Sequence, residues 1–158
     1  MSVQQIMYHM LRFFVKTDKR LAAINEVSGT KTLSNYHIKT LMLWAAELQP
    51  RHLWITDVNA VRICTKLLHT LSVWLTNARC QHYFINSCNL VDSTFNLEII
   101  ASHLMSITKS WLSTWFVNNY ILNWCEHCHF FGRPNVCRSI KLRNAVSEIV
   151  KWRLDIEY

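Results

Sequence analysis

The sequence predicts an all-α fold, a compact multi-helix bundle, and three observations support this prediction. Apolar residues make up 51% of the 158 residues and include seven Trp and seven Phe, so we expect a sizeable core. Glycine and proline number only two each, whereas β-rich folds need these residues at most turns. Apolar residues recur at helical spacing along most of the chain. We find no repeat or linker and expect residues 1–158 to form one domain.

The first part of the chain is expected to hold two helices joined by a polar loop. A helix is predicted from about Val3 to Lys16, with one apolar face formed by Ile6, Met10, Phe13 and Phe14. The stretch from Asn25 to Thr32 contains Gly29 and indicates a loop. Ser34 is suited to N-cap the next helix, which Pro50 ends. Its buried face is expected to comprise Ile38, Leu41, Met42, Ala45 and Leu48.

Two longer helices are expected next. Thr56 or Asp57 can cap a helix that extends to about Asn77. Its predicted inward residues are Val61, Leu67, Leu68, Leu71 and Leu75. Asp92 or Ser93 can start another helix. In that helix the apolar residues at helical spacing are Leu97, Ile100, Leu104, Ile107 and Trp111.

The helical pattern continues to Cys128, where Gly132 and Pro134 follow and break it. A last helix is predicted from about Arg138 to Leu154, burying Leu142, Val146 and Ile149. Several aromatic residues fall within the predicted helices or beside them, and we expect them in the core rather than as stacking platforms. They are Trp44, Trp54, Trp74, Trp111, Trp115, His82 and Tyr83.

The chain carries a formal charge of +7, from 17 Lys and Arg against 10 Asp and Glu. The tightest basic group is Lys16, Lys19 and Arg20, with Lys31 and Lys39 further along. This balance permits an acidic partner such as a nucleotide or nucleic acid, and it equally fits a solvated basic face. We find no secretory signal and no membrane-spanning stretch. We therefore expect an intracellular, cytoplasmic protein without a membrane partner and with reduced cysteines.

Two ordered segments match the signatures of a known family. The first reads Ser34-x-Tyr36-His37-x-Lys39-Thr40, followed by Leu43-Trp44, Glu47 and, at a suitable distance, Trp54. The second reads His82-Tyr83-Phe84-Ile85, followed by Asn89-Leu90. Together they resemble the C-terminal helical domain, similar to helix-hairpin-helix and helix-two-turns-helix domains, of the Mab-twenty-one-like proteins. This family includes cyclic GMP-AMP synthase, and the agreement is clearest over residues 33–90.

The resemblance implies that this domain forms one wall of a nucleotide cleft and part of a ligand-sensing surface. Tyr36 matches the family's base-stacking tyrosine, at a helix N-terminus where the dipole potential is positive. Asn35 stands where a small hydroxyl residue is usual, and its amide can contact a ribose or phosphate. Asn89 matches an amide that the family offers toward the nucleotide. Arg12 falls near the family's phosphate-directed basic residue.

The parts that carry the family's chemistry are missing from this sequence. Gly29 is followed by Thr30 and Gly132 by Arg133, so there is no Gly-Ser pair for a triphosphate. The four aspartates are dispersed, without the strand-borne set that holds two Mg²⁺ ions. We therefore expect a chain that is no enzyme as it stands and holds no cofactor, with a nucleotidyltransferase core as its missing partner. By resemblance, that core would bind Mg²⁺.

A cysteine-rich segment offers a different kind of site. Cys125, Cys128, His129 and Cys137 supply four ligands of the type zinc prefers, although their spacing is not a common framework. The alternative is reduced cysteines around a helix end. The same segment spells the C-x-x-C-H pattern of haem attachment, which we interpret as coincidence because attachment requires export.

Two functions follow from these observations. The first is a non-catalytic helical half that forms the wall of a nucleotide cleft. The alternative is a helical scaffold that binds protein or nucleic acid through its basic face and has no nucleotide role.

Overall fold

The computed structural model of the chain describes residues 2–29, 33–54, 60–91 and 96–122. The α-helices among these residues are α1 (Val3–Thr17), α2 (Lys19–Ser28), α3 (Asn35–Leu48), α4 (Ala60–Thr76), α5 (Leu97–Met105) and α6 (Lys109–Phe116). A 3₁₀ turn at Arg51–Trp54 follows α3, and a π-helix at Val117–Leu122 extends α6. The described residues contain no strand beyond one isolated bridge between Gln81 and Asn89. The predicted all-α fold is confirmed.

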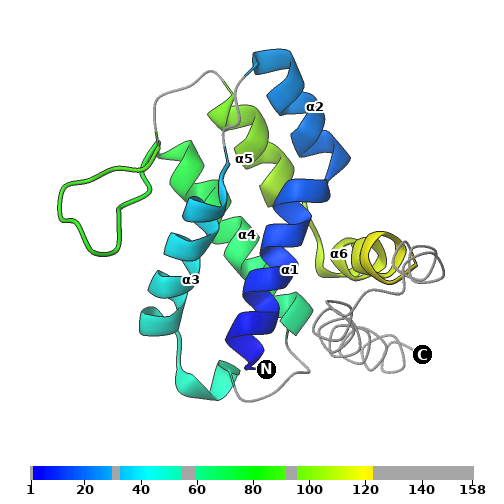
Figure 1. Ribbon diagram of the computed structural model, residues 1–158, viewed down its shortest axis with the longest axis horizontal. Helices are drawn as coiled ribbons and strands as arrows, with labels where there is room; N and C mark the ends of the chain where they lie inside the picture. Colours follow the sequence, from blue (N-terminus) through cyan, green and yellow to red (C-terminus); the bar gives the residue numbers. More distant parts are fainter. Residues whose placement is uncertain (1, 30–32, 55–59, 92–95, 123–158) are drawn as a thin grey trace, which may run out of the picture.

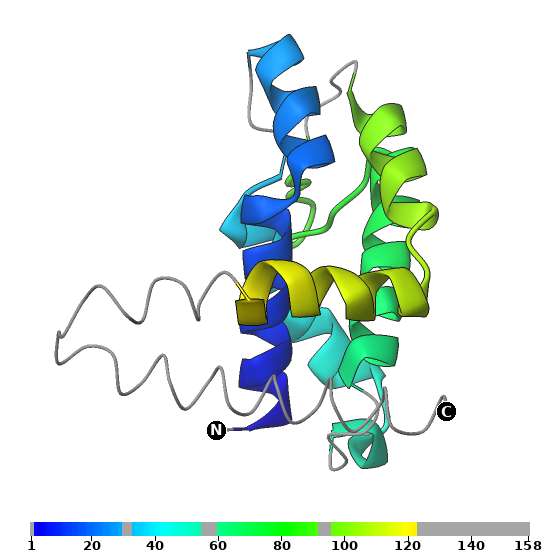
Figure 2. The ribbon, with the colours of Figure 1, turned by 90° about the vertical axis from the view of Figure 1, so that its right-hand side faces the viewer.

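Helix α4 is the central element of the bundle. It packs against α1, α3, α5 and α6, and α2 continues beyond α1 to reach α5. Figure 1 shows the loop between α4 and α5 projecting from the bundle on the side of α3. In Figure 2, α6 runs across the bundle and crosses the direction of α1 and α4. The described helices therefore form a bundle crossed at one level by α6.

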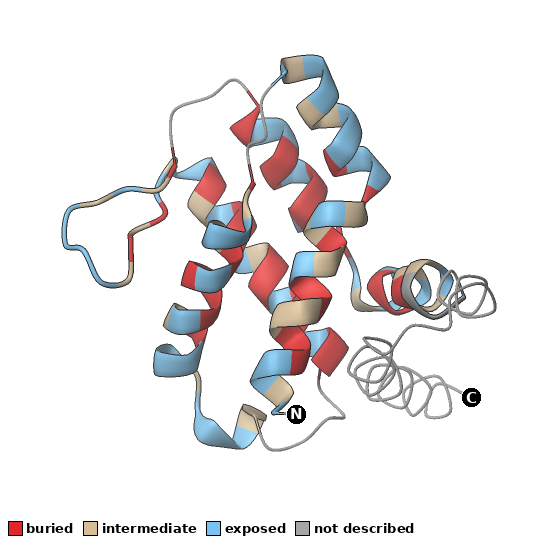
Figure 3. Cartoon of the chain, viewed as in Figure 1, coloured by how far each residue is buried: buried red, intermediate tan, exposed pale blue. Residues whose placement is uncertain are grey.

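The core lies where the inward faces of the helices meet, as the buried residues in Figure 3 show. The predicted inward face of α4 is confirmed, since all five of its residues are buried. On α1, Ile6, Met10 and Phe14 are buried as predicted and Phe13 is half-buried. A buried apolar residue contributes about 1.5–3 kcal/mol. The largest fully buried side chains are Phe14, Phe116, Met7, Met10 and Leu11.

Helix α3 begins and ends close to the predicted positions. The backbone N–H of Tyr36 donates to Ser34 Oγ at 3.3 Å, so the predicted N-cap is confirmed. The helix ends at Leu48, before Pro50. The prediction that Leu48 faces the core is wrong, because its side chain is 71% exposed. The last turn of α3 has left the core, so a residue at the correct helical spacing still faces solvent.

The predicted loop from Asn25 to Thr32 is largely wrong. Asn25–Ser28 form the last turn of α2, which Gly29 ends in the left-handed region at φ +68°. The helix is N-capped by Asp18, whose Oδ2 accepts the N–H of Leu21 at 3.1 Å. Because Leu21 is the only buried residue of α2, the segment lacks the apolar face on which our prediction depended. Residues 30–32 lie outside the described residues.

The helix predicted to run from Asp92 or Ser93 past Trp111 is divided in the structure. Helix α5 ends at Met105, and Thr108 caps α6 by accepting the N–H of Trp111 at 3.2 Å. Ile107 is buried as predicted, but it lies in the link between the two helices and not within a helix. Its helical spacing from Leu104 is therefore a coincidence. Other predicted features lie outside the described residues: the caps at Thr56, Asp57, Asp92 and Ser93, and the helix from Arg138 to Leu154. Among the described helices, none combines the length and apolar character needed to cross a membrane.

Candidate functional site

The two signature segments meet at the start of α3. Tyr36 Oη lies 2.6 Å from His82 Nε2, and the two ring centroids are 5.5 Å apart. His82 is buried, whereas the Tyr36 side chain is 49% exposed. The residues are 46 positions apart in the chain, so the contact fixes the projecting loop to the first turn of α3. Tyr36 is thereby held in place while much of its ring remains accessible.

The hydrogen bonds of His82 define its protonation. Its Nδ1 accepts the backbone N–H groups of Phe84 and Ile85, each at 3.1 Å. A neutral imidazole carries one ring proton, which must therefore lie on Nε2 and point at Tyr36 Oη. Tyr36 Oη accepts this hydrogen bond, which leaves its own proton available to an outside acceptor. The arrangement presents a stacking ring together with a hydrogen-bond donor.

A second histidine fixes the same loop from the neighbouring position. His37 Nδ1 accepts the backbone N–H of Ser34 at 3.1 Å, so its proton lies on Nε2. That Nε2–H donates to the carbonyl of Leu90 at 3.0 Å. The prediction that His37 satisfies local backbone or a neighbour is confirmed. The sequence feature that indicates this role is the position of His37 three residues after the N-cap Ser34, because that spacing allows a capping box.

Two aromatic residues add polar contacts along α3. Trp44 Nε1 donates to the carbonyl of Gln81 at 3.1 Å, and its ring meets that of Tyr83 edge to face. Tyr83 Oη donates to a carboxylate oxygen of Glu47 at 2.7 Å, and this hydrogen bond raises the pKa of Tyr83. These contacts connect the second half of α3 to the start of the loop. The loop is thus held along much of one side of α3.

Asn89 closes the base of the loop. Its Oδ1 accepts the N–H groups of Cys80 at 2.8 Å and Val91 at 3.2 Å, and its Nδ2 donates to the carbonyl of Ala78 at 2.8 Å. Both Oδ1 lone pairs are used within the loop, and one Nδ2 hydrogen remains. The geometry therefore makes Asn89 a residue that positions the loop.

The other predicted contacts lie on exposed surface. Asn35 is exposed in the first turn of α3, beside Tyr36, and Arg12 is exposed on α1. Within the described ranges, no hydrogen bond or ion pair joins Arg12 to Tyr36, Asn35 or Asn89. Of the predicted basic residues, those described are all exposed, namely Lys16, Lys19, Arg20 and Lys39. Lys31 lies outside the described residues.

The tryptophans divide into two groups. Trp54, Trp74 and Trp115 are half-buried and pack against the core, as predicted. The prediction of a core position is wrong for Trp111, whose side chain is 42% exposed. The helix breaks after α5 and α6 runs in a new direction (Figure 2), so Trp111 does not continue the buried face of α5.

The predicted zinc ligands Cys125, Cys128, His129 and Cys137 all lie outside the described residues. Within the part of the chain that the structure describes, no three His, Cys, Asp or Glu side chains are grouped to hold a metal ion. Burial raises the pKa of Cys64 to about 12 and that of Cys80 to about 11. These two thiols therefore stay protonated and unreactive at neutral pH.

One buried polar pair was missed from the sequence. Asp18, at the junction of α1 and α2, accepts a hydrogen bond from His103 Nε2 of α5 at 2.7 Å. Both side chains are 5% exposed. The signal for Asp18 was an N-cap residue eleven positions before the left-handed Gly29, but no local pattern connects it to His103, 85 residues away.

Comparison with known families identifies most of the described chain. The family model of the Mab-21 protein HhH/H2TH-like domain matches residues 4–109, from α1 to the first residue of α6. The match includes both signature segments and the contact between Tyr36 and His82. No solved structure matches the chain.

Proposed function

Because the chain belongs to the Mab-21 protein HhH/H2TH-like domain family, we propose that it is the non-catalytic helical half of a cyclic GMP-AMP synthase-like nucleotidyltransferase. In this proposal the start of α3 forms one wall of a nucleotide cleft and part of a ligand-sensing surface. A nucleotidyltransferase core supplies the opposite wall, the Mg²⁺ ions and the chemistry. This chain supplies binding and orientation.

The geometry of Tyr36 is the observation that carries the proposal. Its ring is held by His82 and remains 49% exposed at the N-terminus of α3. Fixing the ring before a base arrives lowers the entropy cost of stacking. The outward hydroxyl proton can donate to a base or sugar oxygen, and the helix N-terminus favours nearby phosphate charge. These properties suit a nucleotide better than a purely apolar partner.

The neighbouring residues take different roles in this proposal. Asn35 precedes Tyr36 and offers its exposed amide to a ribose or phosphate. Asn89 positions the loop that carries His82, and its remaining Nδ2 hydrogen points to a minor contact at most. Arg12 contributes positive charge from α1. Tyr36 therefore supplies most of the binding energy, since one base stacked on an aromatic ring contributes about 1–3 kcal/mol.

Titration of the full chain with ATP and GTP by calorimetry tests the proposal. We expect a Kd below about 1 mM, corresponding to about −4 kcal/mol. Tyr36→Ala should weaken binding at least about fivefold, the equivalent of 1 kcal/mol of lost stacking. Tyr36→Phe keeps the ring and serves as the matched control, so it should retain most of the affinity.

Two results would overturn the proposal. One is the absence of any measurable nucleotide binding, which would leave the helical scaffold as the function. The other is nucleotide binding of equal affinity in the wild type and Tyr36→Ala. Binding to nucleic acid in place of nucleotide would be recognised by its steep loss of affinity with added salt.

A further inference from the structure

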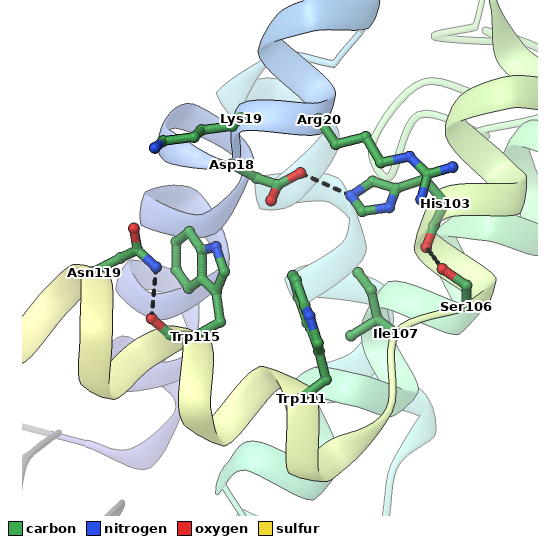
Figure 4. A pocket seen from close by; sticks show the side chains of 9 residues that line it. All are labelled: Asp18, Lys19, Arg20, His103, Ser106, Ile107, Trp111, Trp115 and Asn119. Carbon is green, nitrogen blue, oxygen red and sulfur yellow. Dashed lines mark hydrogen bonds and ion pairs between the residues drawn. The ribbon is translucent and has the colours of Figure 1, made fainter.

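A pocket of about 520 Å³ lies between the start of α2, the end of α5 and α6, and neither Tyr36 nor any residue of the projecting loop lines it. Figure 4 shows the side chains around it: Asp18, Lys19 and Arg20 on one side, and Trp111 and Trp115 rising from α6 on the other. Its remaining lining residues are His103, Ser106, Ile107 and Asn119. None of these residues belongs to the surface around Tyr36.

Asp18 and His103 form the polar floor of this pocket. Asp18 Oδ2 accepts both the N–H of Leu21 at 3.1 Å and a hydrogen bond from His103 Nε2 at 2.7 Å. A carboxylate only accepts, so the Nε2 of His103 must carry a proton. The pair joins α2 to α5 and fixes the orientation of the imidazole ring.

The other ring nitrogen of His103, Nδ1, has no hydrogen-bond partner among the residues that the structure describes. Nδ1 is buried and makes no hydrogen bond with any described residue, and in those ranges only Trp54 Nε1 shares this condition. Buried polar atoms in proteins nearly always have a hydrogen-bond partner, and leaving one without costs about 1–3 kcal/mol. His103 is one of the residues that line the pocket, and because its Nδ1 has almost no accessible surface, a molecule there contacts other atoms of the residue.

The remaining lining residues define the chemistry of that molecule. Lys19 and Arg20 outnumber the single carboxylate of Asp18, so the pocket favours an anion. Trp111 and Trp115 offer indole faces, and Trp111 is 42% exposed although tryptophan is usually buried. Anion-binding cations beside two aromatic rings suit a flat ring that carries an oxyanion.

We propose that this pocket binds a small aromatic oxyanion, an aromatic phosphate or carboxylate. The ring lies against Trp111 and Trp115, and the oxyanion accepts hydrogen bonds from Arg20. Arg20 and His103 are both among the side chains drawn around the pocket in Figure 4.

Calorimetric titration of the full chain with 1-naphthyl phosphate tests the proposal, with inorganic phosphate and 1-naphthol as separate probes. We expect the complete probe to bind at least tenfold more tightly than either part, because ring and oxyanion contacts combine. Trp111→Ala should weaken binding at least about fivefold, the equivalent of 1 kcal/mol of stacking. Because Trp111 is partly exposed, this variant is expected to fold.

Two further variants distinguish this pocket from general charge attraction. Arg20→Gln should weaken binding of naphthyl phosphate at least about fivefold, whereas Arg62→Gln, at an exposed position of α4 outside the pocket, should leave it unchanged. The His103 ring nitrogens, followed by nitrogen NMR, should shift on titration. Equal binding of all three probes, equal weakening by both arginine variants, or an unmoved His103 spectrum would each overturn the proposal.

Discussion

His82 and His103 are both buried, and each bonds one residue distant in the chain, yet their second nitrogens differ. His82 uses Nδ1 for two backbone N–H groups and Nε2 for Tyr36. His103 uses Nε2 for Asp18 and leaves Nδ1 without a partner in the described chain. Both ring nitrogens of His82 are therefore hydrogen-bonded within the described fold, whereas one ring nitrogen of His103 is not.

This difference separates two roles for similar residues. At the α3 surface His82 and His37 hold the loop through hydrogen bonds. The group left with an unused hydrogen-bond donor there is the Tyr36 hydroxyl, next to its exposed ring. At the α6 pocket the atom without a hydrogen-bond partner in the described chain is Nδ1 of the buried His103. In the two proposals, ligand contact is assigned to Tyr36 in the first region and to Trp111 and Arg20 in the second. The predictions below test this division.

The largest expected effect on stability is at the α6 pocket. Asp18→Ala removes the N-cap of α2 and leaves His103 without its buried acceptor. We expect a loss of about 3 kcal/mol in unfolding free energy, measured by urea denaturation. Asp18→Asn keeps an acceptor for both donors and should lose less. An unchanged midpoint in Asp18→Ala would contradict the assigned role of the pair.

A somewhat smaller effect is expected at the base of the projecting loop. Asn89→Ala removes three hydrogen bonds, to Cys80, Val91 and Ala78, and should cost about 2 kcal/mol. Hydrogen exchange should show faster exchange of the Cys80 and Val91 amides. Asn89→Asp keeps the acceptor and should protect these amides partly. If Asn89→Ala instead abolished ATP binding without changing exchange, Asn89 would be a contact residue.

Tyr36→Phe should have a modest effect on stability. It removes the acceptor of the His82 Nε2–H while retaining the ring, so we expect a loss of about 1 kcal/mol in unfolding free energy. The indole signal of Trp44 in NMR spectra should stay near its wild-type position, because the remaining contacts still hold the loop. A loss several times larger would mean that this one hydrogen bond holds the whole loop.

The smallest effect concerns Cys64, a fully buried residue of α4. Burial raises the pKa of its thiol from 9.0 to about 12. The folded thiol stays protonated while the unfolded thiol ionises, so its contribution is complete below pH 9 and is lost as pH rises toward 12. At pH 9.5 the contribution of this thiol to the unfolding free energy should be smaller by about 1 kcal/mol. Denaturation curves of the wild type and Cys64→Ala at pH 7 and pH 9.5 should show this difference, and equal pH dependence in both would contradict it.

The sequence predicts the elements whose signals are local. The capping of α3 by Ser34 and the apolar face of α4 follow from residues a few positions apart, and both are confirmed. Helix α2 was missed because its apolar face holds one buried residue, Leu21. The break after Met105 was missed because Ile107 and Trp111 continue the helical spacing of α5 by chance.

The sites follow the same rule. The signature segments predict Tyr36 as a surface residue of interest, but its bond to His82 depends on how the loop returns to α3. Asp18 and His103 are 85 residues apart and meet only because α2 packs against α5. Contacts of that kind have no sequence pattern, so the α6 pocket is visible only in the folded chain.

The most direct test of the account titrates ATP and 1-naphthyl phosphate into each of two variants, Tyr36→Ala and Trp111→Ala. We predict that Tyr36→Ala weakens ATP and leaves naphthyl phosphate unchanged, and that Trp111→Ala does the reverse. Each weakening should be at least about fivefold, the equivalent of 1 kcal/mol of stacking. ATP binding that depends on Trp111 and not on Tyr36 would contradict the account, because the nucleotide would then occupy the α6 pocket.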